Sequence, residues 1–227
     1  MTRLLALLLL TALAAPAGAA ERRFTIISFD RIRMEAPFDV VLTTGKAPSA
    51  RAEGPVGALD TVDLRVEGRT LIIRQRSSWN GAGKGVPVRI SLATPDIRAA
   101  ILTGSGRLSI DRMTGLTANL ALAGPGRIQV ADLRADRLDL LAGGSGTVAL
   151  AGAVKTGRIG TEGAVVLDAS ALQSDDLTLV ATGSSEVRVA ARRSVNLTAS
   201  GAATVTLGGP VACIQKVTGA ATVSGCR

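Results

Sequence analysis

The residues that could do chemistry in this chain of 227 residues include carboxylates, basic residues and two cysteines, but no histidine. Histidine is the commonest general base and the commonest metal ligand in proteins. Its absence excludes a Ser-His-Asp triad and a histidine-ligated zinc site. A polysaccharide lyase would need clustered carboxylates to hold a metal ion and a basic residue to abstract a proton.

The aspartates do not form a recognisable catalytic pattern. Asp111 and Asp168 each follow an alternating apolar segment, but three repeats of the chain separate them. The other candidates lie in or beside connecting segments: Asp132, Asp136, Asp139, Asp175 and Asp176. We expect these acids to be solvated or to cap backbone amides. A polysaccharide lyase-like, carbohydrate-active enzyme stays an alternative.

Calcium binding by the glycine-rich turns is not indicated either. Calcium requires hard oxygen ligands at fixed positions beside the glycines. Only Glu186 is acidic among the residues that stand three places after the turn positions given below. We therefore expect no metal ion and no cofactor.

Two cysteines, Cys213 and Cys226, lie near the C-terminus. An even cysteine count in an exported chain favours a disulfide over a metal site or a free thiol. The loop that it closes is short, and loop entropy would give it about 3 kcal/mol of stabilisation.

The only tryptophan, Trp79, stands with Asn80 in a polar, glycine-rich stretch from Ser77 to Gly85 that we expect to be a loop. An exposed tryptophan can anchor a sugar or a protein partner. Trp79 and Asn80 are therefore possible ligand contacts, although a tryptophan more often folds back over a core edge.

The net charge of +8 comes from basic residues that are spread along the chain. Arg107 and Arg127 occupy equivalent repeat positions and could stack on the outside of adjacent coils. With almost no aromatics to stack bases, we expect no nucleic-acid partner. A periplasmic module that binds an anionic ligand stays a further alternative.

Residues 1–20 have the features of a secretory signal peptide. Met1-Thr2-Arg3 is a short positive start, Leu4 to Ala14 is an apolar run, and Ala17-Gly18-Ala19 is a small-residue cleavage pattern. The run is too short for a membrane-spanning helix, which needs about 20 residues. We expect export to the periplasm or the cell surface, with residues 21–227 forming a single domain that does not span the membrane.

A repeat of strand, glycine turn and strand fills residues 99–227. The first turn residues are Gly104, Gly124, Gly144, Thr161, Gly183, Gly201 and Gly219. A second turn glycine follows at Gly106, Gly126 and Gly146. An aliphatic residue stands four places after every first turn residue, which is typical of strands with one buried face.

One such unit cannot bury its apolar face alone, whereas stacked units complete a continuous core. We therefore predict an all-β protein, a right-handed β-solenoid whose coils contribute short strands to parallel sheets. Links such as Ala131 to Asp136 are expected to join the coils. An antiparallel β-sandwich of consecutive hairpins is the alternative.

Residues 21–98 are expected to form irregular N-terminal strands. Val62 to Val66 and Leu71 to Ile73 flank Glu67-Gly68-Arg69, a hairpin signal, and one helical turn is expected within Val56 to Asp60.

The Gly-Ser-Gly turns at Gly104 and Gly144 and the segments from Phe29 to Ile32, Ala36 to Val40 and Gly68 to Ile73 resemble a known bacterial family. It is the "putative auto-transporter adhesin, head GIN domain" family, of unknown function. The resemblance implies a two-sheet β-superhelix, similar in shape to pectin lyases but without their catalytic residues. It also implies a role in cell adhesion or in the cell envelope.

We therefore expect an exported, non-enzymatic β-solenoid that serves as an adhesion or cell-envelope structural module. Its expected partners are a surface polysaccharide or an envelope protein, and it could also form a homo-oligomer.

Overall fold

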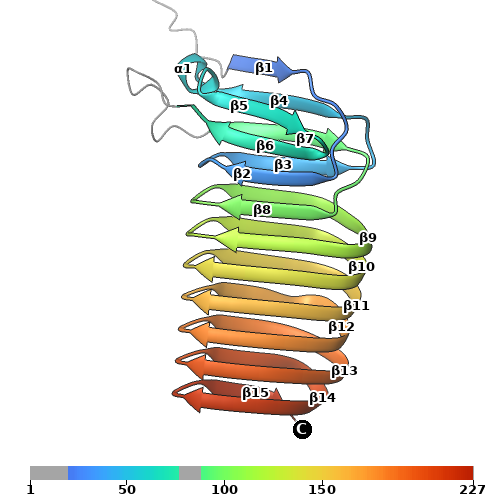
Figure 1. Ribbon diagram of the computed structural model, residues 1–227, viewed down its shortest axis with the longest axis vertical. Helices are drawn as coiled ribbons and strands as arrows, with labels where there is room; N and C mark the ends of the chain where they lie inside the picture. The colour runs from blue at the N-terminus through green and yellow to red at the C-terminus, as the bar shows by residue number, and fades with distance from the viewer. Residues whose placement is uncertain (1–19, 77–87, 227) are drawn as a thin grey trace, which may run out of the picture.

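The computed structural model describes residues 20–76 and 88–226, and nearly all of these residues are in strands (Figure 1). The short elements come first: β1 (Ala20–Phe24), β2 (Arg31–Glu35), β3 (Asp39–Thr44), β4 (Ser49–Gly54), α1 (Val56–Leu59), β5 (Val62–Glu67), β6 (Thr70–Gln75), β7 (Arg89–Thr94) and β8 (Ala99–Thr103). The long strands and a short last strand follow: β9 (Arg107–Ala123), β10 (Arg127–Gly144), β11 (Thr147–Gly163), β12 (Val166–Gly183), β13 (Glu186–Gly201), β14 (Thr204–Gly219) and β15 (Thr222–Cys226).

Each long strand forms one coil of a β-solenoid, and the coils stack in parallel (Figure 1). β9 shows how a coil is built: Arg107–Ile110 pair with β3, whereas Asn119–Ala123 pair with β8. The strand therefore begins in one sheet, bends, and ends in a second sheet. We call the sheet that contains β8 the front face and the sheet that contains β3 the rear face. The predicted solenoid is confirmed, and the antiparallel sandwich is wrong.

The bend of each coil differs from the expected link. Ala131 to Asp136 lie inside β10, and the strand continues through the bend with only a register shift between Val130 and Leu133. Leu133 is fully buried at this bend and keeps the corner attached to the core. The strand stays paired because its backbone groups find partners in both neighbouring coils, and a loop would have left them to water.

The glycine turns close each coil at the opposite edge. Gly124 has a φ of +109°, which other residues rarely adopt, and its N–H donates to the carbonyl of Gly143 in the next coil at 3.0 Å. Gly126 is needed for a different reason: a Cβ there would lie 2.6 Å from the carbonyl oxygen of Gly104. A positive φ recurs at the first turn positions Gly104, Gly144, Gly183, Gly201 and Gly219.

The expected turn at Thr161 is wrong by two residues. Gly163 pairs in register with Gly144 and Gly183 and has a φ of +93°, so the turn begins there. Thr161 lies in the strand instead, where it is buried and donates from its hydroxyl to Ser185 Oγ at 3.1 Å. With Gly163 as the turn residue, the spacings on either side become 19 and 20 residues in place of 17 and 22.

The core of the coils consists of aliphatic side chains that stack on their equivalents in the next coil. Ile128, for example, is fully buried and pairs in register with Leu108 and Val148. The bulkier Phe29 and Phe38 are buried only in the N-terminal part. Small aliphatics suffice in the repeat because two flat sheets enclose a narrow interior.

The N-terminal strands are irregular and cover one end of the stack (Figure 1). β1 pairs with β4, and β4 with β7, in the antiparallel sense. The predicted hairpin is β5–β6, with a φ of +59° at Gly68. The predicted helical turn is α1, and no helix in the described ranges is long or apolar enough to cross a membrane.

Candidate functional site

The candidate site is the outer surface of the front face, where three columns of exposed residues run along the stack. Strand pairing places equivalent residues of successive coils side by side, about 4.8 Å apart. The middle column is mainly apolar and consists of Ile101, Ala121, Leu141, Gly160, Val180, Thr198 and Lys216. Its side chains point to solvent because the strand alternates, and the residues on either side point into the core.

Three aliphatic side chains of the middle column are exposed to solvent. Leu141 is 69% exposed, Val180 is 45% exposed and Ile101 is 42% exposed. Contiguous apolar residues at an exposed face mark an interaction surface more often than isolated ones do.

Around Leu141 and Gly160 the front face is hollowed into a groove of about 750 Å³. The groove is wide because small residues stand beside large ones: Ala121 and Gly160 flank Leu141 in its column. A Cβ added at Gly143 would meet no atom within 4 Å, so the groove is open at that point. The arrangement can take up an apolar side chain.

Charged residues border this groove on both sides. Asp139 and Arg158 are neighbours in the column on one side, and Glu162 stands in the column on the other side next to Gly143. The site therefore combines an apolar floor with a small number of charges that could orient a partner.

The sequence reasoning missed this surface, although a signal was present. Ile101, Leu141 and Val180 each stand three places before a turn glycine, where alternation calls for a solvent-facing residue. An aliphatic residue at such a position is unexpected, and its recurrence is the signal.

The aspartates that could have served a carbohydrate-active enzyme cap or pair within their own neighbourhood. Asp111 accepts from Thr44 N at 2.9 Å and from Thr44 Oγ1 at 3.0 Å. Hydrogen bonds from the hydroxyl and the N–H of Ser170 hold the pKa of Asp168 below its usual value.

The acids near the bends are held by basic side chains. Asp132 lies 3.0 Å from Arg134, and Asp136 lies 2.8 Å from Lys155. Among residues 20–76 and 88–226, no group of three acidic or cysteine side chains could hold a metal ion.

Asp30 is a buried carboxylate that the sequence reasoning did not single out. Its carboxylate forms an ion pair with Arg69 at 2.9 Å, and Arg31 and Arg98 lie within about 4 Å. Asp30 therefore ties the β5–β6 turn and the start of β8 to β2. Its surroundings give it a structural role.

The basic residues follow two patterns. Arg107 and Arg127 do lie side by side in register on the rear face. Arg22, near the N-terminus, forms an ion pair with Asp60 at 2.7 Å, and Arg33 forms one with Glu35 at 2.6 Å. Arg22 and Arg33 are thus each paired with an acid of the N-terminal part.

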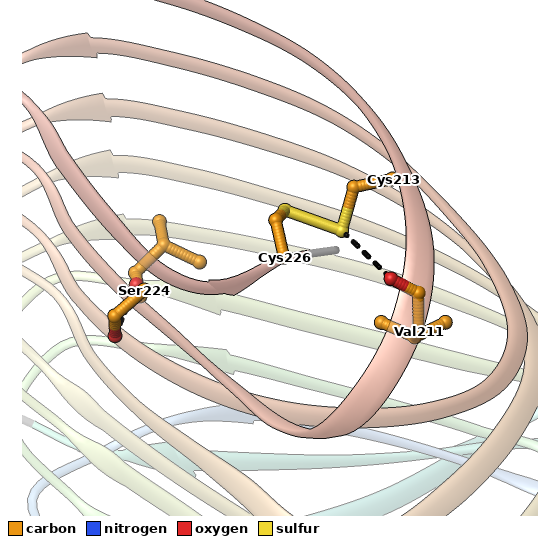
Figure 2. The surroundings of a disulfide bond; sticks show 5 residues. Val211, Cys213, Ser224 and Cys226 are labelled. Atoms are coloured by element: carbon orange, nitrogen blue, oxygen red, sulfur yellow. Dashed lines mark hydrogen bonds between the residues drawn. A yellow bond between two sulfur atoms is a disulfide. The ribbon is translucent and has the colours of Figure 1, made fainter.

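Cys213 and Cys226 form the predicted disulfide, with their Cα atoms 5.5 Å apart (Figure 2). Cys213 pairs in register with the buried Val195, so it occupies an inward-facing position of the last coil. The bond therefore closes the end of the stack. Trp79 and Asn80, the possible ligand contacts, lie outside the described residues.

A sequence model of the family described as "Putative auto-transporter adhesin, head GIN domain" matches residues 28–210. The chain belongs to this GIN-domain family. The expected membership is confirmed, and the match spans the irregular strands and most of the coils. A comparison with curated proteins gave no match.

Several solved structures have the same fold. A protein titled a "putative adhesin" from Bacteroides fragilis is 17% identical, with a TM-score of 0.80, over 92% of this chain and 96% of that one. A "putative adhesin" from Parabacteroides distasonis is 17% identical, with a TM-score of 0.68, over 90% and 95% of the two chains. A protein from the same species titled "Putative lipid binding protein" is 16% identical, with a TM-score of 0.67, over 92% and 96%. At these identities the likeness shows that the GIN domain has the same fold as these proteins, and it assigns no ligand to the chain.

Proposed function

We propose that this GIN domain is an exported, non-enzymatic adhesion module of the cell envelope that acts by contact through its front face. The family and the names of its structural neighbours support adhesion as the general role. Export is supported by the signal-peptide features of residues 1–20.

The observation that carries the proposal is the apolar middle column with its groove. The inward side chains of every coil are used for packing, so function must be carried on the outside. There the largest exposed aliphatic side chain of the column, Leu141, borders a hollow that charges flank. Such a surface leaves apolar area exposed to water until a partner covers it.

The two alternatives have less support. A carbohydrate-active enzyme needs an acid and a base that converge on one bond, whereas Asp111 and Asp168 act as caps on different coils. A module for anionic ligands would rest on Arg107 and Arg127, a single pair of basic residues.

Binding and turnover can be separated in one experiment. The purified chain is incubated with a panel of surface glycans and envelope fragments, and both retention and released oligosaccharide are measured. We expect retention without release. Leu141→Asp should reduce retention at least about tenfold because a charge would be buried against the partner. Val166→Asp on the rear face is the matched control, since Val166 is also an exposed aliphatic.

Released oligosaccharide would reject the non-enzymatic function. Equal losses for both variants would mean that the front face is not the binding surface. Fractionation and protease accessibility of the mature chain in cells test export separately, and retention in the cytoplasm would contradict it.

A further inference from the structure

The middle column of the front face is complementary to itself when its order is reversed. From β8 to β13 it reads large, small, large, small, large and then Thr198. Reversed about a point between β10 and β11, Leu141 comes opposite Gly160, and Ala121 comes opposite Val180. Ile101 comes opposite Thr198. Every large side chain thus meets a smaller one.

A two-fold axis that lies parallel to the strands produces this reversal. It places two front faces against each other with their stacks antiparallel, and each residue faces its own column on the partner. Leu141 leans toward its own Gly160, where an added Cβ would lie 3.0 Å from Leu141 Cδ2. Each Leu141 therefore partly covers its own Gly160, and the two copies of Leu141 lie side by side around the axis.

The charges beside the groove obey the same symmetry. Asp139 and Arg158 lie in one column, on β10 and β11, so the axis puts Asp139 opposite Arg158 of the second copy and repeats the pair on its other side. In the column on the other side of the groove, Glu162 comes opposite Gly143, where an added Cβ would meet no atom within 4 Å. Each of the three charged residues nearest the axis therefore faces either an opposite charge or open space.

The ends of the front face are consistent with this arrangement. Lys216 on β14 comes opposite Arg33 on β2, which is a pair of like charges. Arg33, which stands in register with Ile101, is paired with Glu35 at 2.6 Å in its own chain, and Glu35 also pairs with Arg74, so the charge of Arg33 is partly offset. At the rim, where water screens charges, the remaining repulsion is small.

The size of the face is sufficient for a weak dimer. Seven coils about 4.8 Å apart and five residues of about 3.3 Å each give a footprint of roughly 550 Å² per copy. Two copies together would bury about 1,100 Å², just above the roughly 1,000 Å² that a specific interface needs.

We propose that the front face binds a second copy of this chain, face to face and with antiparallel stacks. The dimer itself does not depend on the proposed function, but its role does. If the proposed function holds, the dimer joins copies on facing envelopes or within one envelope. The antiparallel arrangement points the two N-terminal ends in opposite directions.

Sedimentation equilibrium of the purified chain tests the dimer. We expect a reversible monomer–dimer equilibrium with a Kd on the order of micromolar. A chain that remains monomeric at millimolar concentration would overturn the proposal.

Charge exchange tests the geometry. Asp139→Arg and Arg158→Asp each place like charges opposite one another, and each should raise the dimer Kd at least about tenfold. An equimolar mixture of the two variants places opposite charges together again, so it should form a heterodimer with a Kd near that of the original chain. Both side chains are on the solvent side of the sheet, so folding should be unchanged, and circular dichroism checks this.

One control variant and one further test variant complete the experiment. Gln129→Arg changes the charge of the exposed rear face and should leave the Kd unchanged. Gly143→Gln fills the open space that faces Glu162 and should weaken the dimer without lowering the melting temperature.

A second symmetric arrangement gives a different result. If the axis ran along the stack, Arg158 would face Glu162 of the other copy and Asp139 would face Gly143. Asp139→Arg alone would then leave the dimer intact, and its mixture with Arg158→Asp would not be restored. That outcome would overturn the antiparallel arrangement.

The dimer and the adhesion role fail in distinguishable ways. A dimer that responds to charge exchange, with Leu141→Asp leaving retention on envelope fragments unchanged, would uphold the interface and reject the adhesion surface. Loss of retention by Leu141→Asp in a chain that stays monomeric would uphold the adhesion surface and reject the second copy as its partner.

Discussion

At the scale of single residues, this chain uses its charges to hold the fold. The alternating strands put acids and arginines on the same outer surfaces, and they pair there across coils or cap nearby backbone. Asp111 caps Thr44 in this way, and the buried Asp30 forms an ion pair with Arg69. These residue types can serve catalysis only when they converge on one site, and the composition alone does not show whether they do.

The ion pairs of Glu35 make stability depend on pH in a predictable direction. The hydrogen bond from Arg74 at 2.8 Å, supported by the charges of Arg74 and Arg33, holds the pKa of Glu35 below its usual value. A carboxylate with a depressed folded pKa stabilises the protein above its unfolded pKa of about 4.3. That contribution is lost as the pH falls through the folded pKa.

We therefore expect Glu35→Gln to lower the melting temperature slightly at pH 7 and not at all well below pH 4. Thermal melts of both chains between pH 2 and pH 7 measure the difference. The effect is small because both arginines are about half exposed to solvent, and added salt should reduce it further. A difference that grows as the pH falls would contradict the assigned direction.

At the scale of the elements, the turn is the part of each coil that tolerates least change. Its first residue needs a positive φ, and its third position faces inward against the preceding coil. Gly126 fills that third position in one coil, whereas Val165 and Ser185 fill it in later coils and are buried. The turns therefore form two groups, one with no room for a side chain and one with a side chain packed inside.

A matched pair of substitutions distinguishes these roles. Gly126→Ala should destabilise the fold by about 2 kcal/mol or more, because the new Cβ would lie 2.6 Å from the carbonyl oxygen of Gly104 and packed structures resist such overlap. Gly143 lies in β10 and faces open space. Gly143→Ala should therefore change stability by about 0.5 kcal/mol at most. Chemical denaturation measures both, and equal effects would show that the turn has more room than its geometry implies.

At the scale of the whole molecule, a stack of coils has two ends, and this chain treats them differently. The N-terminal end is covered by antiparallel strands and α1, and its edge strand β1 carries Glu21, Arg22 and Arg23, which discourage further pairing. At the C-terminal end the repeat fades: Gln215 stands in register with Leu197, and Val217 is 41% exposed. A terminal coil has one neighbour only and is the first to fray.

The disulfide compensates for this weakness at the open end. Replacing Cys213 and Cys226 together by serine should lower stability by about 3 kcal/mol on the loop-entropy account, since the bond spans 13 residues. The loss should be local because each coil depends on its neighbours. Hydrogen exchange is expected to accelerate in β14 and β15 and to stay unchanged in β10.

Mass spectrometry under non-reducing conditions provides the control for the bond itself. Two free thiols in the mature chain would contradict the disulfide, and uniform acceleration of exchange along the whole stack would contradict a local role.

The sequence alone determined the coil. Aliphatic residues such as Leu120, Leu122 and Ile128 alternate along the strands and are separated by turn glycines. Alternation along a strand sets which side chains face inward, so this pattern alone predicts the coil. The cysteine pair and the family resemblance could be inferred in the same way.

Only the tertiary structure decided which residues stand side by side in different coils. Thr161 and Gly163 show why: both fit a turn by local pattern, and the pairing of Gly163 with Gly144 and Gly183 settles the choice. The groove beside Leu141 is likewise made by residues about 20 positions apart along the chain, which come together only through strand pairing. Local chemistry fixes the direction of a side chain, but hydrogen bonds between coils fix its neighbours, and a binding surface consists of neighbours.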